Sequence, residues 1–215
     1  MNRKNLAITD AGAFRQSAVT FVLCVINILI FLIEELNGGS WDVDTAIRFG
    51  AMYRPLLMEG EWWRLFTSMF VHFGMDHLVS NTISLLLIGV SLEQHCGHIR
   101  FLLIYILGGL AGNGFSLLIE GGSPQQAVSA GASGAVFAIL GGYIALALIW
   151  KRTGVANINL VLTIVAAGYM FYRSMGTGVN IEAHLGGLIA GFFLGLLLCR
   201  PAWSRTRKET MDLWR

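Results

Sequence analysis

Three groups of polar residues lie within or beside long apolar runs, and their side chains are those of nucleophilic catalysis. Ser133 lies in the small-residue stretch SAGASGA at 129–135, His184 opens a glycine-containing run, and His77 and Asn81 stand four positions apart. An imidazole accepts a serine proton at neutral pH, which makes His184 the candidate base for Ser133. Residues four apart share one face of a helix, so His77 and Asn81 are candidate donors to an oxyanion. The pattern predicts acyl transfer at Ser133.

The backbone at Ser133 offers a further donor. Ser133 begins an apolar run that predicts a helix. The first N–H groups of a helix have no intrahelical partner, and the helix dipole is positive at that end. The Ser133 N–H is therefore a third candidate oxyanion donor. The stretch is not the G-x-S-x-G nucleophile elbow of soluble hydrolases, because Ala135 stands where that motif has glycine.

The composition places these residues in a membrane protein. The 215 residues are 55% hydrophobic and 13% charged, with mean hydropathy +0.64, whereas soluble domains carry about 25% charged residues. Several apolar runs are long enough to cross a hydrocarbon core of about 30 Å. The chain is predicted to be an all-α, polytopic membrane protein. Its net charge of +2 is too small to indicate a nucleic-acid partner.

Six membrane-spanning helices are predicted, at residues 18–33, 78–92, 99–119, 133–150, 158–172 and 184–199. With both termini in the cytosol, the inner segments hold eleven of the 15 basic residues, as the positive-inside rule requires. This topology brings Ser133, His77 and His184 to the same, outer side of the membrane. Polar groups in a membrane are costly, so their shared depth points to function.

The predicted domain covers residues 17–200, between a cytosolic tail at 1–16 and a basic cytosolic tail at 201–215. The outer segment 34–77 is too apolar for a solvated loop and too interrupted to span, so it is expected to lie half sunk in the outer leaflet. Its tryptophans suit the headgroup level. No cleavable leader or organelle-targeting segment is recognised, so a bacterial inner membrane is the expected location.

Small residues are placed where the fourth and sixth predicted spans could meet. His184, Gly187, Gly191 and Gly195 form one helical stripe. The fourth span offers a matching set: Gly134, Ala138, Gly141, Gly142 and Ala145. A crossing through such residues brings backbones close together, which a serine and a histidine on different helices require.

The three cysteines are scattered along the chain. Cys24, Cys96 and Cys199 form no C-x-x-C pair and no Cys/His spacing typical of a metal site. They are interpreted as small apolar residues outside any disulfide framework. No metal and no organic cofactor is expected.

These residues together resemble the rhomboid family of intramembrane serine proteases, over residues 48–195. Gly131-Ala132-Ser133-Gly134 resembles the family's GxSG motif, and AHLGGLIAG at 183–191 resembles AHxxGxxxG. His77 and Asn81 match its HxxxN pair, Trp63 and Arg64 match the WR pair of its first outer loop, and LEQHCGHIRF at 92–101 is similar to its link between spans two and three.

The resemblance implies a six-helix rhomboid-like bundle with a long interfacial loop between the first two helices. It implies a Ser133–His184 dyad that cleaves transmembrane segments of other proteins near the outer face, with His77, Asn81 and the Ser133 N–H holding the oxyanion. Trp63 and Arg64 would anchor the outer loop, and the fifth span would move to admit substrate. One position departs from the family: a tyrosine that stacks on the catalytic histidine is Phe137 here, which keeps the ring and loses the hydroxyl.

Two other functions stay open. A secondary transporter also has short, glycine-interrupted helices with polar groups at depth, but the predicted spans carry almost no carboxylates and show no repeat. An inactive rhomboid-like protein that binds membrane segments for quality control typically lacks the serine or the histidine, and both are present here. Glu182 is a weak candidate for a third catalytic residue, because two positions from His184 it lies on nearly the opposite helix face.

Overall fold

The computed structural model describes residues 15–119, 128–151, 165, 168–170, 172 and 179–199. This part is largely helical. The long helices are α2 (Ala18–Leu36), α8 (His98–Ile119), α9 (Ser133–Lys151) and α11 (Ile181–Leu198). A further long helix, Gly74–Cys96, runs without a break through α6 (Gly74–Ser84), the π-helical turn η1 (Leu85–Gly89) and α7 (Val90–Cys96).

Four of the described helices are long and apolar enough to cross a membrane: Ala18–Leu36, Gly74–Cys96, His98–Ile119 and Ile181–Leu198. A shorter apolar helix covers Ser133–Leu148. The four long helices lie where the first, second, third and sixth spans are predicted, and the shorter helix lies where the fourth span is predicted. Most of the predicted fifth span, 158–172, and most of both predicted tails lie outside the described residues.

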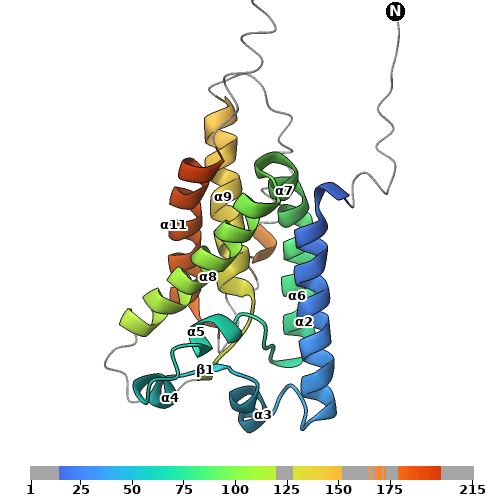
Figure 1. Ribbon diagram of the computed structural model, residues 1–215, viewed down its shortest axis with the longest axis vertical. Coiled ribbons are helices and arrows are strands. Elements are labelled where there is room, and N and C mark those ends of the chain that lie inside the picture. The colour runs from blue at the N-terminus through green and yellow to red at the C-terminus, as the bar shows by residue number, and fades with distance from the viewer. Residues whose placement is uncertain are drawn as a thin grey trace, which may run out of the picture.

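Helices α8, α9 and α11 pack against one another through backbone contacts (Figure 1). A β-carbon on Gly187 would collide with the Gly134 carbonyl oxygen, and one on Gly191 would collide with that of Ala138. A β-carbon on Gly195 would lie 2.7 Å from the Gly142 α-carbon. The contacts follow in the same order along both helices, so α9 and α11 run parallel. The predicted crossing of the two small-residue stripes is what the structure contains.

The start of α2 is fixed by a carboxylate from α7. Ser17 makes no side-chain cap. Instead the fully buried Glu93 accepts the N–H groups of Val19 and Thr20, at 2.9 and 2.7 Å, and the Thr20 hydroxyl at 2.6 Å. These bonds satisfy amides that a helix start leaves unpaired. They bring the beginning of α2 to the same end of the bundle as α7.

Between α2 and α6, the predicted outer segment forms short elements at the opposite end of the bundle from α7 (Figure 1). They are α3 (Val43–Arg48), β1 (Met52–Tyr53), α4 (Arg54–Met58) and α5 (Arg64–Thr67). The buried Arg64 links them, because its Nη1 donates to the carbonyls of Ile47 and Ala51 at 2.6 and 3.2 Å, and its Nε lies 2.6 Å from Glu61. The same guanidinium lies over the Trp63 ring.

The interpretation of Cys96 and Cys199 as unpaired apolar residues is wrong. The two form a disulfide with their α-carbons 5.1 Å apart. They are 103 positions apart in the chain, but Cys96 is the last residue of α7 and Cys199 directly follows α11, and the bundle brings these two helix ends together. Spacing alone gives no sign of such a pairing. Cys24 is free and buried, as expected.

Candidate active site

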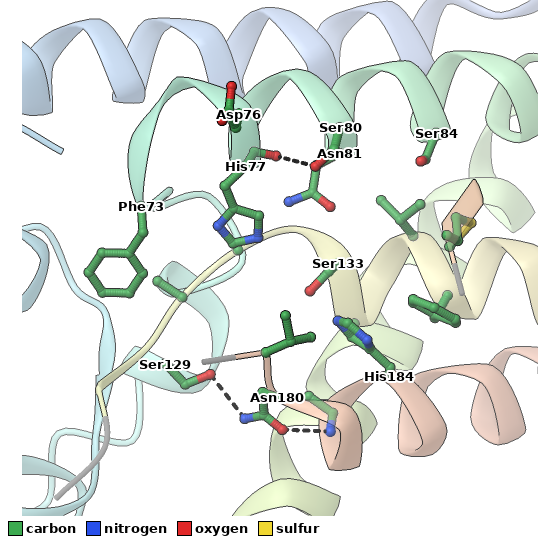
Figure 2. A pocket seen from close by; sticks show the side chains of 18 of the residues that line it. Phe73, Asp76, His77, Ser80, Asn81, Ser84, Ser129, Ser133, Asn180 and His184 are labelled. Carbon is green, nitrogen blue, oxygen red and sulfur yellow. Dashed lines mark hydrogen bonds between the residues drawn. The ribbon is translucent and has the colours of Figure 1, made fainter. Parts of the chain in front are cut away.

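A cavity of about 660 Å³ lies between α6, α9 and α11. Figure 2 shows that four of the predicted site residues direct their side chains into one space: Ser133, His184, His77 and Asn81. They come from three helices that are far apart in the sequence. The other lining residues are largely small, apolar or neutral polar, including Ser80, Asn113 and Met170.

Ser133 is the first residue of α9, directly after a loop that is held at several points. Strand β2 (Val128–Ser129) pairs antiparallel with β1, and the Gly131 N–H donates to the Ser68 carbonyl at 2.8 Å. Gly131 has φ +130°, a conformation that only glycine adopts without strain. These bonds fix residues 128–132 to the outer segment and place the Ser133 hydroxyl at the cavity. Because Ser133 is the candidate nucleophile, these residues are called the nucleophile loop.

His184 lies in the first turn of α11, which begins three residues before the predicted start. Asn180 caps this helix, since its Oδ1 accepts the Ala183 N–H at 2.8 Å. The same side chain donates to the hydroxyls of Ser116 and Ser129 at 2.7 and 3.0 Å, and Figure 2 shows how it joins α11 to the nucleophile loop. Asn180 therefore fixes the position of His184 along the helix axis relative to Ser133.

The His184 ring is buried and stacks on Phe137. The two ring centroids are 4.4 Å apart and the planes meet at 16°. The side chain that departs from the family pattern thus occupies the stacking position that the resemblance implies for it. The contact restricts rotation of the imidazole, so the ring that would accept a proton has a defined orientation.

His77 and Asn81 lie on successive turns of α6 and face the nucleophile loop. A β-carbon on Gly131 would lie 2.7 Å from His77 Nε2, so the absence of a side chain there lets the imidazole approach the loop. The Asn81 side-chain N–H₂ is buried and makes no hydrogen bond with the described part of the chain. A buried amide donor normally has a partner. An amide that faces a cavity without a partner can donate a hydrogen bond to an oxygen atom of a bound molecule.

Four of the remaining predicted site residues lie outside the cavity lining. Gly187 and Gly191 hold α11 against α9, and Trp63 and Arg64 organise the outer segment. Gly134 lies in the lining beside Ser133. Glu182, the weak candidate for a third catalytic group, is absent from the lining of the cavity.

Two residues in or beside this site were missed at the level of sequence. Asn180 carries a recognisable signal, because asparagine directly before an apolar run is a preferred helix cap. His72 carries a weaker one, as a histidine in an apolar stretch five positions before His77. Its importance depends on contacts with residues about 60 positions away, which no local pattern predicts.

The helices and the site define an integral membrane protein that places a serine, a histidine and an amide in one cavity, and the amide N–H₂ has no hydrogen-bond partner in the described part of the chain. A sequence model of the Rhomboid domain matches residues 59–201, a range that includes Ser133, His184, His77 and Asn81. The chain belongs to the rhomboid family.

The chain is similar to rhomboid proteins of Bacillus subtilis and of Arabidopsis thaliana. Rhomboid protease GluP of Bacillus subtilis is 39% identical over 199 residues, covering 90% of this chain and 38% of that protein. RHOMBOID-like protein 5 of Arabidopsis thaliana is 38% identical over 171 residues, covering 76% of this chain and 53% of that protein. YdcA of Bacillus subtilis is 33% identical over 184 residues, covering 83% of this chain and 87% of that protein. The chain thus spans about half or less of the length of the first two.

Proposed function

We propose that this chain is an intramembrane serine endopeptidase, which cleaves transmembrane segments of other membrane proteins near the outer face. Ser133 is the nucleophile and His184 the base of a dyad. The observation that carries the proposal is the convergence of Ser133, His184 and Asn81 on one cavity from three separate helices. Further support comes from the relatives named as proteases, such as GluP.

The reaction is acyl transfer through a covalent intermediate. His184 takes the hydroxyl proton as the Ser133 oxygen bonds to a backbone carbonyl carbon of the substrate. His77, Asn81 and the Ser133 N–H stabilise the negative oxygen of the tetrahedral intermediate. His184 then gives its proton to the leaving amine as the C–N bond breaks. A water molecule, deprotonated by His184, attacks the acyl ester, and the Ser133 hydroxyl is restored when the ester bond breaks.

The proposed membrane arrangement has six spans, with both termini in the cytosol of a bacterial cell. Parallel packing of α9 and α11 supports this count, because residues 152–180 must connect the end of one helix to the opposite end of the bundle. The predicted fifth span, 158–172, lies within that connection and would admit substrate. The half-exposed Trp62 and Trp63 suit an outer segment at headgroup level.

The direct test is cleavage of a model transmembrane substrate by the purified chain reconstituted in lipid vesicles. We expect two products, with the cut mapped by mass spectrometry to the part of the substrate segment near the outer face. Vesicles with the Ser133→Ala variant should leave the substrate intact. If the wild-type chain binds several such substrates and cleaves none, the proposal is wrong and the inactive, segment-binding alternative takes its place.

Replacing Asn81 by alanine tests the oxyanion assignment. Loss of one such donor typically lowers kcat by about 10²–10³-fold, and we expect this fall with little change in KM, because the charge develops only in the transition state. Ser84→Ala is the matched control, since Ser84 lies one turn further along and lines the same cavity. A folded Asn81→Ala variant with wild-type kcat would remove Asn81 from the mechanism.

A further inference from the structure

A third histidine, His72, lies next to the site and is not used in the proposed mechanism. It belongs to the segment between α5 and α6 and is fully buried. Its ring meets the His77 ring edge-on, with centroids 5.3 Å apart. It is also in contact with the nucleophile loop, because the Ala132 N–H points at its Nε2 atom.

The hydrogen bonds of His72 determine its tautomer. Nδ1 lies 3.0 Å from the Phe70 carbonyl oxygen, which can only accept, so Nδ1 carries the proton. In the neutral ring Nε2 is then an acceptor, and it accepts the Ala132 N–H over a long 3.5 Å. A protonated ring would carry hydrogen on both nitrogens and would repel that N–H group.

The surroundings of His72 keep the ring neutral. Burial lowers its pKa to about 3, the neighbouring His77 acts in the same direction, and the Phe70 carbonyl opposes them. The charged form is therefore absent at physiological pH. The acceptor at Nε2 is therefore available at neutral pH.

The position of His72 connects two parts of the oxyanion site. Two successive N–H groups before Ser133 bind the segment that precedes α6: Gly131 donates to Ser68, and Ala132 donates to His72. The same ring supports His77, one of the proposed oxyanion donors. A single side chain thus touches both the peptide before the nucleophile and a donor from a different helix.

We propose that His72 is a positioning residue of the proteolytic site, which holds the Ala132 peptide and the His77 ring in a fixed relation so that the oxyanion donors are pre-organised. This inference rests on the proposed protease function. His72 touches no reacting atom and transfers no proton.

Three substitutions separate the contacts of this ring. Glutamine can place an oxygen near the Nε2 position and keep the bond from Ala132. Asparagine can place an N–H₂ near Nδ1 and keep only the bond to Phe70. Phenylalanine keeps the ring but neither hydrogen bond. We expect His72→Gln to retain kcat within about threefold, and His72→Asn and His72→Phe to lose about tenfold, the effect of one hydrogen bond. KM for a transmembrane substrate should stay unchanged in all three variants.

A double-mutant cycle with His77→Ala distinguishes positioning from general stability. His72→Phe removes the bond from Ala132 and with it the fixed relation between that peptide and the His77 ring. If this relation is what His72 provides, the tenfold loss should shrink to less than about threefold once His77 is alanine. The control is His95→Phe, a histidine of α7 that does not line the cavity, whose effect should be the same in both backgrounds.

The outcomes are distinct. Wild-type cleavage with an unchanged kcat in folded His72→Phe overturns the inference and leaves the proposed function standing. Effects of His72→Phe and His77→Ala that simply multiply would also overturn it. If His72→Phe does not fold, the ratio of kcat between the Gln and Asn variants decides, and equal values contradict the inference. Absence of cleavage by the wild-type chain overturns both proposals.

Discussion

Replacing Ser133 or His184 by alanine is expected to abolish cleavage while the protein stays folded. The hydroxyl is the only group that can form the acyl bond in the proposed reaction, and without the imidazole it stays protonated at neutral pH. In soluble serine proteases such losses lower kcat by on the order of 10⁶-fold, which places both variants below detection. Product formation in vesicles measures this, with thermal unfolding of each variant to verify the fold.

The dyad also predicts how the two substitutions combine. Because both residues serve one chemical step, the double variant should be no slower than either single variant. Ser91→Ala and His95→Ala are matched controls, since they remove the same side chains from α7, away from the cavity lining. Cleavage that persists in a folded Ser133→Ala variant would mean that another residue is the nucleophile.

The apolar runs predicted the long helices well because length and hydropathy are local properties. The first, third and fourth predicted spans agree with α2, α8 and α9 to within three residues at either end. One of the ends that were missed depends on a particular cap. Helix α11 begins at Ile181, since Asn180 accepts an amide of its first turn. The second span begins at Gly74, four residues before the apolar run.

The residues of the candidate site were accessible from sequence for a different reason. Ser133, His77 and His184 are polar side chains at one predicted depth, and such groups are rare in membrane segments. The glycine stripe that begins at His184 indicated that the fourth and sixth spans could pack closely against each other. These arguments need only the periodicity of a helix and a side of the membrane, both of which the sequence contains.

Contacts between distant segments were beyond such arguments. Glu93 binds the start of α2 across 73 positions, and His72 meets Ala132 across 60. Cys96 and Cys199 are 103 positions apart. In each case the way that the helices pack decides which of the chemically equivalent residues become partners, even for the cysteines, of which the chain has three. A single sequence states the available groups but not which of them become neighbours.

The close packing of α9 against α11 predicts that Gly191→Leu abolishes cleavage, although Gly191 does not line the cavity. Even a β-carbon at this position would collide with the Ala138 backbone, which cannot rotate away as a side chain can. The helices must separate, at a cost of at least about 3 kcal/mol, the upper range for overpacked cores. A shift of about 1 Å already costs about 10²-fold in rate, so cleavage should be lost along with thermal stability.

Gly114→Leu is the matched control for that substitution. It changes the same residue type within a long helix, α8, but a β-carbon there meets no atom of the described residues within 4 Å. Leucine also favours the helix over glycine, by up to about 1 kcal/mol. We expect this variant to cleave at the wild-type rate and to unfold at the same temperature or higher. Equal behaviour of the two leucine variants would show that close contact between α9 and α11 is not what brings His184 to Ser133.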